Sequence, residues 1–311
     1  MSTIWKIIFN PNAGAGKGKT DQKKILQLLK NNNIDYSIAI SERPKHSIEL
    51  ARVAIIEGYR NIIAVGGDGT LNEIVNGIFT QKKVNASDIQ LALIPIGTGN
   101  DWAKTFGISS NYKKAINIIK TNTIFKQDVG KVVIDSKSGE KERFFINMAG
   151  FGFDAMTAKK ANELKLKGYR GKKVYIWSLI VSYIKFRFKI VELKIDTQLH
   201  RFNFFSASVG IGKYNGGGIK QAPNAIPNNG KFSITVIKKI SLWNILKNIA
   251  GLYNGNFVKD KHIETFVGES IKINSKLSLL GEVDGEYIGN TSYKIKIISK
   301  SLNVIIGSCK F

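Results

Sequence analysis

The sequence predicts an α/β N-terminal domain built on a parallel sheet, followed by a β-rich C-terminal domain in which an antiparallel sandwich carries helical inserts. Over the first 125 residues, short apolar runs alternate with amphipathic stretches, as they do in βα units. After residue 126, most apolar runs follow one another without an intervening helix, which is typical of antiparallel sheets. We therefore expect domains over 1–125 and 126–300, with a C-terminal tail at about 300–311 that returns to the first domain.

The expected elements of the first domain alternate along the chain. Strands are predicted over Ile4–Phe9, Asp35–Ile40, Asn61–Val65 and Gln90–Pro95, and helices over Thr20–Asn32, Lys45–Glu57 and Leu71–Phe79. Strands separated by such helices run parallel, so their carboxyl ends meet at one edge of the sheet, where ligands of α/β sheets bind. Three glycine-rich segments follow strands at that edge.

The second domain is expected to contain seven apolar strands and two helical inserts. The strands are Lys131–Ile134, Phe144–Met148, Phe188–Ile195, Phe202–Val209, Lys231–Val236, Ser270–Ile273 and Ser292–Ile298, and the helices cover about Asp154–Tyr183 and Leu242–Tyr253. Within the first helical insert, Val174–Ile184 is apolar but shorter than the ~20 residues of a membrane-spanning helix. Trp102, Trp177 and Trp243 are expected to pack in hydrophobic cores.

The composition implies an anionic partner. The chain of 311 residues has 47 lysines and arginines against 23 acidic residues, a formal net charge of +24. A hydrophobic content of 43% is that of a globular protein. The one cysteine, Cys309, excludes a disulfide framework within the chain, and the N-terminus does not read as a signal peptide. These features predict a cytoplasmic protein whose basic surface meets nucleic acid, a nucleotide or an acidic membrane.

The glycine-rich segments suit phosphate binding. The first, Asn10–Lys19, lies between a strand and a helix, where glycine allows a close backbone approach and the helix N-terminus offers free N–H groups. A bare turn without a ligand is an equally good interpretation of this loop taken alone. The second is Gly66-Gly67-Asp68-Gly69-Thr70, and the third, Gly97-Thr98-Gly99-Asn100-Asp101, repeats the arrangement one βα unit later. Two such turns with two carboxylates suit Mg²⁺-assisted phosphoryl transfer. The alternative for Asp68 is a helix cap in a structural turn.

These segments resemble the catalytic domain of the diacylglycerol kinase family, which includes soluble bacterial lipid kinases and the sphingosine and ceramide kinases. The matching segments, in the family's order, are Asn10–Gly18, Gly66–Thr70 with Asn72 and Glu73, Gly97–Ala103, Asp128–Gly130, Asn147–Asp154, Gly216–Pro223 and Val283–Glu286. NAD kinases and phosphofructokinases share the GGDG turn, so the resemblance implies an N-terminal domain like theirs. The third segment and Asp284-Gly285-Glu286 together resemble lipid kinases specifically.

The resemblance implies an ATP site in the cleft between the two domains. The residues that match nucleotide-binding positions are Asn10, Pro11, Asn12, Ala13, Gly14, Ser41, Gly66, Gly67, Asp68, Gly69, Thr70, Leu71, Asn72, Thr98 and Asn100. Glu286 matches the proton acceptor for the lipid hydroxyl, and Asp68 and Asp284 are expected to act with it in catalysis. Judged from the residues alone, Asp284-Gly285 also suits a tight hairpin turn that leaves Glu286 merely exposed.

Two magnesium sites follow from the same resemblance. Asp68, Asp101 and Asp128 match a network of aspartates, water and Mg²⁺ that links the domains. A structural Mg²⁺ of bacterial members corresponds to Ile226, Asn229 and Lys231, with Asn229 where the family has aspartate. An amide oxygen is a weaker ligand for Mg²⁺ than a carboxylate, so this second site is in doubt.

The predicted activity is the ATP- and Mg²⁺-dependent phosphorylation of diacylglycerol to phosphatidic acid. A sphingoid or other lipid alcohol, or a soluble acceptor as in NAD kinases, is the alternative. Nucleic acid is not expected as a partner, because aromatic-rich recognition motifs are lacking. Bacterial relatives also suggest a homodimer.

The basic excess is concentrated in one stretch. Between Ala155 and Arg201 there are 12 lysines and arginines and 3 acidic residues. Here Lys172-Lys173 and Lys185-Phe186-Arg187 flank the apolar run, which suits a helix that lies on an anionic membrane surface. A core helix with solvated lysines is the alternative. The first interpretation predicts a cytoplasmic enzyme that associates peripherally with the membrane during turnover.

Overall fold

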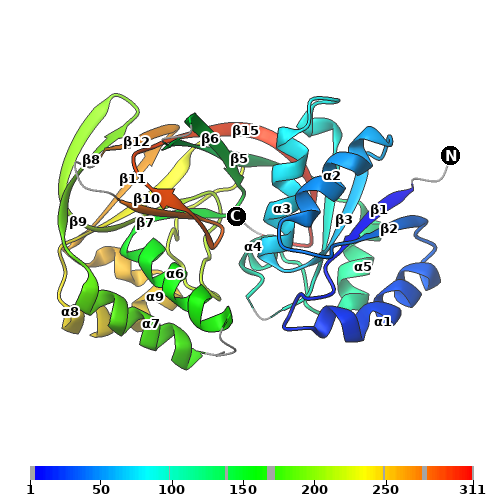
Figure 1. Cartoon of the computed structure of the whole chain (residues 1–311), viewed down its shortest axis with the longest axis horizontal. Helices are drawn as coiled ribbons and strands as arrows, with labels where there is room; N and C mark the ends of the chain where they lie inside the picture. The colour runs from blue at the N-terminus through cyan, green and yellow to red at the C-terminus, as the bar shows by residue number, and fades with distance from the viewer. Residues whose placement is uncertain are drawn as a thin grey trace.

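The first domain is built on four parallel strands in the order β2, β1, β3 and β4 (Figure 1). The computed structural model describes residues 4–97, 99–136, 139–166, 172–247, 249–274 and 279–309. The strands are β1 (Trp5–Phe9), β2 (Tyr36–Ile40), β3 (Asn61–Gly66) and β4 (Gln90–Pro95). The helices between and after them are α1 (Lys17–Asn31), α2 (His46–Ile56), α3 (Asp68–Thr80), the 3₁₀ turn η1 (Ala86–Asp88), α4 (Asp101–Thr105) and α5 (Tyr112–Thr121). The predicted α/β domain with a parallel sheet is confirmed.

The second domain is β-rich, with antiparallel pairing between its strands. Its strands are β5 (Ile124–Ser136), β6 (Gly139–Phe145), β7 (Met148–Gly152), β8 (Lys189–Ile195), β9 (Gln198–Gly210), β10 (Phe232–Lys238), β11 (Ile263–Gly268), β12 (Ser270–Asn274), β13 (Leu280–Val283), β14 (Glu286–Asn290) and β15 (Tyr293–Ile305). The helices α6 (Phe153–Leu166), α7 (Lys172–Lys185), α8 (Leu242–Lys247) and α9 (Ile249–Asn254) lie together at one end of this domain, and η2 (Asn256–Lys259) follows them (Figure 1). The predicted β-rich domain with helical inserts is also confirmed.

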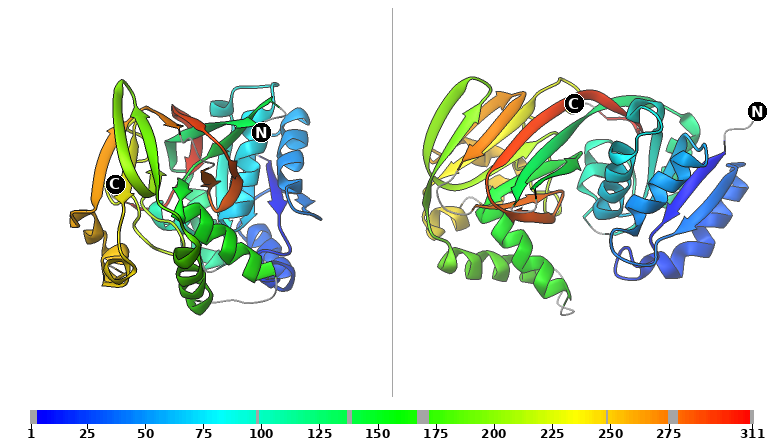
Figure 2. Two further views of the ribbon diagram at one scale, coloured as in Figure 1. Left: turned by 60° about the vertical axis from the view of Figure 1, so that its left-hand side comes forward. Right: turned by 45° about the horizontal axis from the view of Figure 1, so that its top comes forward.

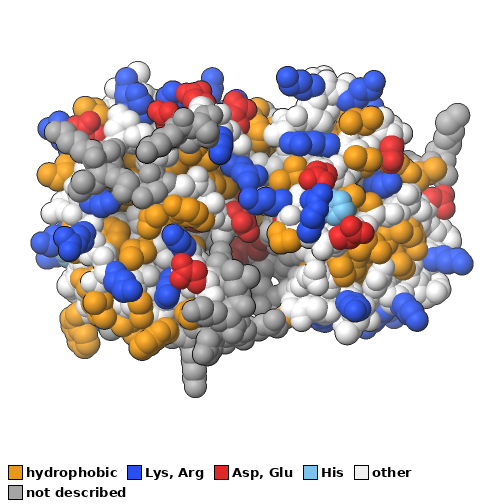
Figure 3. Space-filling model, viewed as in Figure 1, with side chains coloured by type: hydrophobic (Ala, Val, Ile, Leu, Met, Phe, Trp, Pro, Cys, Tyr) orange, Lys and Arg blue, Asp and Glu red, His pale blue; other side chains and the backbone are white. Residues whose placement is uncertain are grey.

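One long strand pair joins the two domains. Strands β5 and β15 pair antiparallel from Tyr293 opposite Ile134 to Ile305 opposite Ile124, and they arch over both domains (Figure 2). At its far end β15 also pairs parallel with β4, through Asn303 and Val304. The expected boundary near residue 125 thus falls at the start of β5, and its partner β15 joins the strands of both domains into one continuous sheet. Figure 3 shows that the surface is hollowed where the domains meet.

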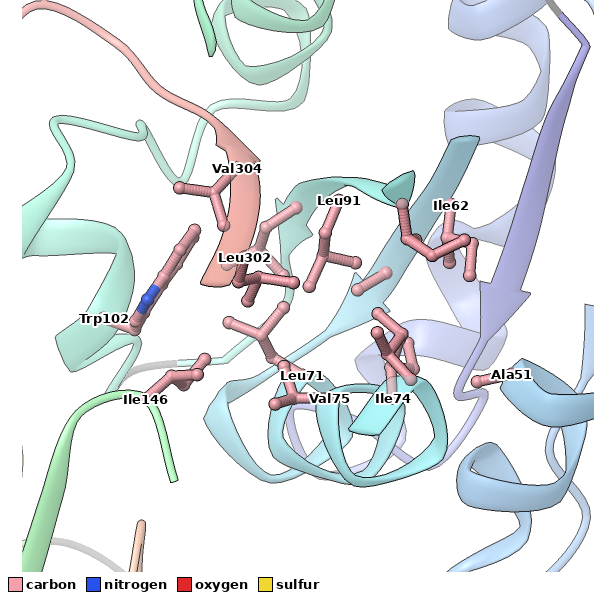
Figure 4. Close-up of a cluster of buried hydrophobic side chains, with 14 of the residues drawn as sticks. Ala51, Ile62, Leu71, Ile74, Val75, Leu91, Trp102, Ile146, Leu302 and Val304 are labelled. Carbon is pink, nitrogen blue, oxygen red and sulfur yellow. The ribbon is translucent and has the colours of Figure 1, made fainter. Parts of the chain in front are cut away.

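The hydrophobic core of the first domain extends to this junction. Leu71, Ile74 and Val75 of α3 point toward Leu91 of β4 and the neighbouring strands (Figure 4). The same cluster includes Trp102 of α4, Leu302 of β15 and Ile146 of the second domain. Burial of apolar surface contributes roughly 25 cal/mol per Å², so a shared cluster favours a defined arrangement of the two domains.

The predicted strand Phe144–Met148 is wrong, because the chain bends at Ile146 and Asn147 between β6 and β7. The amides of Ile146, Asn147 and Met148 donate to the carboxylate of Asp284, which competes with strand pairing at this point. Strands β11, β13 and β14 were not expected from the sequence.

Two tryptophans lie on the surface, contrary to expectation. Trp102 is buried, but Trp177 of α7 is 60% exposed and Trp243 of α8 is 66% exposed. Among the described residues, no helix is both long enough and apolar enough to cross a membrane.

Candidate active site

Three glycine-rich turns converge at the carboxyl ends of the parallel strands. The amide of Asn10, at the end of β1, donates to the carbonyl of Val65, and its Nδ2 donates to Thr70 Oγ1 at 2.9 Å. Gly14 has φ +60°, and a Cβ there would lie 2.9 Å from Ile96 Cγ2 and 3.3 Å from the amide nitrogen of Gly97. The first turn therefore touches both of the others, and only glycine fits at their contact.

The start of helix α1 suits an anionic ligand. The helix begins at Lys17 after Gly16, which has φ +89°, and its first turn has no acidic residue. The amides of Gly18 and Lys19 already donate to the carbonyls of Ala13 and Pro11, so the attraction for phosphate comes from the helix dipole and from the positive charges of Lys17 and Lys19. Asn12 is exposed in the turn, whereas Ala13 is buried. Ser41 follows β2 beside this turn, and its amide donates to the carbonyl of Phe9 at 2.8 Å.

The two aspartates of the second and third turns meet. Asp68, the first residue of α3, accepts hydrogen bonds from the amides of Asp101 at 2.8 Å and Trp102 at 3.2 Å. Asp68 therefore caps α4 rather than its own helix, a structural role close to the alternative in the sequence analysis. Burial raises the pKa of Asp68 to about 6, and the charges of Asp101 and Asp284 act in the same direction.

Asp101 connects this turn to the second domain. Its Oδ1 lies 2.9 Å from Nζ of Lys104, and its Oδ2 accepts a hydrogen bond from the amide of Gly217 at 2.7 Å. Gly217 belongs to a glycine-rich loop of the second domain and has φ +92°. Asp101 thus holds the two domains together across the cleft.

Asp68 and Asp101 are the carboxylates at the glycine-rich turns that could hold a magnesium ion bound to a nucleotide. Their carboxylate oxygens already accept hydrogen bonds from the protein, and the described residues include no group of three His, Cys, Asp or Glu side chains that could hold a metal ion. Magnesium in kinase sites keeps several waters and binds one or two carboxylates plus the substrate phosphates. These two aspartates could hold such an ion, directly or through its waters.

Asp128 lies apart from Asp68 and Asp101. Its carboxylate accepts hydrogen bonds from the amides of Gly230 and Lys300, both at 2.7 Å, and from Ser299 Oγ at 3.3 Å. It therefore fastens the 226–231 loop to β15. The structure does not bring the three predicted aspartates into one cluster.

The residues of the predicted structural magnesium site share that loop. Asn229 Oδ1 accepts a hydrogen bond from the amide of Lys231 at 3.0 Å, and the amide of Gly230 points to Asp128. Ile226, at the start of the loop, is 41% exposed. Asn229 Oδ1, the oxygen that would take the place of a carboxylate ligand in this magnesium site, is thus already used in a local turn.

Asp284 anchors a tight turn between β13 and β14. Asp284 and Gly285 have φ values of +46° and +85°, and Val283 pairs with Glu286, so the strands are joined by a two-residue hairpin. The Asp284 carboxylate accepts four hydrogen bonds, from Asn72 Nδ2 at 2.8 Å and from the amides of Ile146, Asn147 and Met148 at 3.0, 3.1 and 2.9 Å. Burial raises the pKa of Asp284, and these donors act in the opposite direction.

Glu286 is presented by this turn. Its side chain is exposed, and no hydrogen bond or ion pair within the described residues holds its carboxylate. The turn is fastened through Asn72 to α3, the helix that begins with Asp68. An unengaged carboxylate on a turn that is fastened to α3 has the chemistry of a general base. The tight hairpin and the exposed Glu286 are what the alternative interpretation of Asp284-Gly285 as a simple turn expected. A carboxylate exposed on such a turn can still act as a general base.

The remaining predicted nucleotide-binding residues differ in whether their side chains are available to a ligand. Leu71 points into the core (Figure 4), and the Asn72 amide is used by Asp284 and by the carbonyl of Phe144, so neither side chain is free for a nucleotide. Asn100 has φ +47° and donates to the carbonyl of Gly97 at 3.0 Å, which shapes the third turn. Gly66 and Gly67 pack against Thr70 and the carbonyl of Ile96. Gly69 has open space beside it, Pro11 is partly exposed, and Thr98 lies outside the described residues.

Two acids near the turn, the buried Glu282 and the half-buried Asp154, were not identified as site residues from the sequence. Burial raises the pKa of Glu282, on β13, to about 8. Burial also raises the pKa of Asp154, at the start of α6, to about 6, although Ser208 Oγ donates to it at 2.9 Å. The space-filling view shows acidic side chains gathered at the centre of the face, in the hollow between the domains (Figure 3).

Comparisons with known proteins agree with this architecture. The model of the diacylglycerol kinase catalytic domain matches residues 5–132, and that of the YegS C-terminal NAD kinase beta sandwich-like domain matches residues 147–306. The diacylglycerol kinase of Bacillus subtilis (strain 168) is 26% identical over 97% of this chain and 95% of its own. That of Staphylococcus haemolyticus (strain JCSC1435) is 29% identical over 93% of this chain and 84% of its own.

Solved structures support the fold. A crystal structure of a diacylglycerol kinase from Bacillus anthracis str. Sterne superposes with a TM-score of 0.71 at 22% identity, over 98% of this chain and 97% of that chain. Yeast NADH kinase superposes with a TM-score of 0.57 at 10% identity, over 99% of this chain and 84% of that chain. The matched models follow one another along almost the whole sequence, so this chain belongs to the diacylglycerol kinase catalytic-domain family.

Proposed function

We propose that this protein is a lipid kinase that uses ATP and Mg²⁺ to phosphorylate the hydroxyl of diacylglycerol, giving phosphatidic acid. The observation that carries the proposal is the arrangement of Glu286. Its exposed carboxylate sits on a turn that Asp284 fastens to Asn72 of α3, and α3 begins at the phosphate-binding edge with Asp68. The names of the relatives support a lipid acceptor.

The proposed reaction assigns a task to each part of the cleft. The backbone of the turns at Asn10–Gly14 and Gly66–Gly69 binds the phosphates. Asp68 and Asp101 would hold a Mg²⁺ ion, which would supply neutralisation of the phosphate charge. Glu286 accepts the proton of the lipid hydroxyl while the lipid oxygen bonds to the γ-phosphorus. The bond from that phosphorus to the β,γ-bridging oxygen breaks, and ADP leaves.

The test is a panel of acceptors with the purified protein, [γ-³²P]ATP and Mg²⁺ in mixed micelles. We expect label in phosphatidic acid when diacylglycerol is present, and loss of the label when EDTA removes Mg²⁺. A sphingoid base, ceramide and NAD⁺ are the other acceptors. Label in one of the other lipids would mean that this lipid, not diacylglycerol, is the substrate. Label in NAD⁺ would indicate a soluble acceptor. No label in any acceptor would contradict the proposal.

We also propose that the helical end of the second domain docks on an anionic membrane. Trp177 and Ile184 are exposed on α7, and Trp243 is exposed on α8, at the same end of the domain (Figures 1 and 2). Lys185 and Arg187 are exposed beside them, and Lys247 Nζ lies 5.2 Å from the centre of the Trp243 ring. Exposed tryptophan next to basic residues is the composition of membrane-interface surfaces. The side chains of Lys172 and Lys173 lie outside the described residues.

A cavity near this surface supports lipid entry. It has a volume of about 220 Å³ and opens at the C-terminal end of α7. Its apolar walls include Met156, Phe204 and Leu279, and Lys185, Arg187 and Lys189 supply its basic rim. Apolar walls with a cationic rim suit the part of a lipid where the acyl chain meets the headgroup.

The double substitution Trp177→Ala with Trp243→Ala is expected to weaken binding to phosphatidylglycerol vesicles by about 10- to 100-fold, because two large apolar side chains are lost from the contact. Nucleotide binding should not change, since both residues are remote from the glycine-rich turns. Vesicle cosedimentation and nucleotide titration measure the two effects. Leu199→Ala is the control, because Leu199 is 60% exposed on β9, outside these helices. Unchanged vesicle binding by the double variant would contradict the proposed surface.

A further inference from the structure

The buried side chain of Glu282 holds the Asp284–Gly285 turn through a hydrogen bond. It lies on β13, two residues before Asp284, and is only 2% exposed. Its Oε2 accepts a hydrogen bond from the amide of Gly285 at 2.6 Å. Because Val283 pairs with Glu286 directly across the turn, this bond fixes the residue immediately before Glu286.

The neighbouring strand leaves room for this carboxyl group. Gly150 of β7 is the partner of Glu282 in the sheet. A Cβ at Gly150 would lie 2.5 Å from Glu282 Oε1, closer than any side chain tolerates. The absence of a side chain at Gly150 is thus what allows Glu282 to fold over β7 and reach Gly285.

The charged groups that act on Glu282 are acidic. Asp284, in the turn, and Asp154, on α6, both raise its pKa, whereas the Gly285 amide and the Asn215 side chain lower it. The other titratable groups on the elements that pack against β13 include Lys159, Lys160 and Glu163 on α6, Glu286 and Tyr287 on β14, and Glu140, Lys141, Glu142 and Arg143 on β6. Lys159 Nζ lies 4.9 Å from the centre of the Tyr287 ring, and β7 has no titratable side chain over Met148–Gly152.

These surroundings favour a neutral carboxyl group. Burial raises the pKa of Glu282 to about 8, so the group is mostly protonated at pH 7. Loss of the proton would put a second negative charge beside the Asp284 carboxylate in a buried place. The Gly285 amide favours the ionised form, but burial and repulsion from Asp284 and Asp154 outweigh it, so ionisation disfavours the observed position of the turn and of Glu286.

We propose that neutral Glu282 is a positioning residue that holds the Asp284–Gly285 turn, and with it Glu286, in the reactive arrangement, and that its ionisation limits phosphoryl transfer at high pH. The inference rests on the proposed function, because it takes Glu286 to be the proton acceptor. It adds a residue that itself touches neither nucleotide nor lipid.

The first experiment compares kcat against pH for the native protein and Glu282→Gln, with ATP and diacylglycerol in mixed micelles. Glutamine keeps an oxygen for the Gly285 amide and cannot ionise. One ionisation near pH 8 predicts that native kcat falls roughly 30-fold between pH 7 and 9.5, whereas Glu282→Gln stays within about 3-fold of its pH 7 value. Glu264→Gln, an exposed residue paired with Lys238 on β10, is the control and should keep the native profile. An unchanged fall in kcat for Glu282→Gln would overturn the positioning role.

A second readout does not depend on activity. A carboxyl whose folded pKa is about 8, above its ordinary value of 4.5, contributes stability that is fully present below pH 4.5 and is lost as the pH rises through 8. We expect the Tm of the native protein to fall by roughly 5 °C more than that of Glu282→Gln between pH 6 and 9. Equal pH dependence of Tm would overturn the inference about Glu282, whereas no turnover with any acceptor would overturn the proposed function.

A third variant separates the hydrogen bond from the charge. Glu282→Leu removes the acceptor for the Gly285 amide at every pH. We expect it to lower kcat at pH 7 by about tenfold or more, with the KM for ATP unchanged because the turn does not bind the nucleotide. Folding of this variant is checked by its Tm. A folded Glu282→Leu protein with native kcat at pH 7 would show that the Gly285 bond does not position Glu286.

Discussion

Glu286→Gln is expected to lower kcat for lipid phosphorylation by about 10²- to 10⁴-fold, the usual contribution of a general base. The amide matches the carboxylate in size but cannot accept the proton of the lipid hydroxyl. The side chain is exposed and unengaged, so its replacement removes no contact that supports the fold. The measurement is steady-state turnover with diacylglycerol in mixed micelles, at saturating ATP and Mg²⁺.

Nucleotide affinity separates this role from a structural one. The expected ATP site lies on the turns of the first domain, so Glu286→Gln should bind ATP as tightly as the native protein. Glu140→Gln is a matched control, since Glu140 is an exposed residue of β6 whose ion pair with Lys294 lies outside the cleft. A variant that lost ATP binding and turnover to the same extent would show that Glu286 supports the site rather than the chemistry.

Asp284→Ala is expected to destabilise the protein by about 3–6 kcal/mol, because four hydrogen-bond donors lose their acceptor and each buried unsatisfied group costs about 1–3 kcal/mol. Three of the donors are backbone amides, two in the bend between β6 and β7 and one at Met148, the first residue of β7. Alanine at φ +46° adds strain, since aspartate tolerates the left-handed region better. Chemical denaturation and Tm measure the loss.

A double-mutant cycle tests the link across the domains. Asn72→Ala removes one of the four donors and should cost less than Asp284→Ala. Because Asn72 and Asp284 are in contact, the effects of the two substitutions should not add, and the coupling energy should be about 0.5–3 kcal/mol. Simple additivity would mean that the Asn72–Asp284 bond does not connect the domains energetically.

The phosphate-binding edge is predictable because its signals are local. Periodicity identifies the βα units, and the predicted strand Gln90–Pro95 coincides with β4. Glycine at a turn after a strand marks a close backbone approach wherever the chain later folds. Asp68 and Asp101 meet because they follow adjacent parallel strands, whose carboxyl ends meet at one edge by topology.

Asp128 illustrates what such signals omit. Successive side chains of a strand point to opposite faces, and Gln127 points to Trp102, whose Nε1 donates to it at 3.0 Å. Asp128 must therefore face the 226–231 loop rather than the other two aspartates. The position of β5 relative to α4 determines which face of the strand points toward Trp102. No pattern of neighbouring residues in the sequence gives that position.

The burial of Glu282 beneath a helix could not be predicted from the sequence either. In Leu279–Val283, alternation places Glu282 on the face opposite the buried Leu279, Gly281 and Val283, where a polar residue would be expected to meet solvent. Helix α6 packs over β13, and the Glu282 side chain is buried. The opposite error concerned Trp177 and Trp243, whose apolar rings suggested a core. Their helices do pack against the domain, but these two side chains lie on the exposed faces of α7 and α8.

The two-domain architecture, the glycine-rich turns and the resemblance that singles out Glu286 can be inferred from the amino-acid sequence, because period, glycine placement and motif order are properties of neighbouring residues. The folded protein is needed to see which carboxylates face one another, which one is left unengaged on the Asp284 turn, and that Glu282 is buried behind it. Those relations join residues from Asn72 to Glu286 through sheet order and helix packing. They arise only when β5 and β15 bring the two domains together.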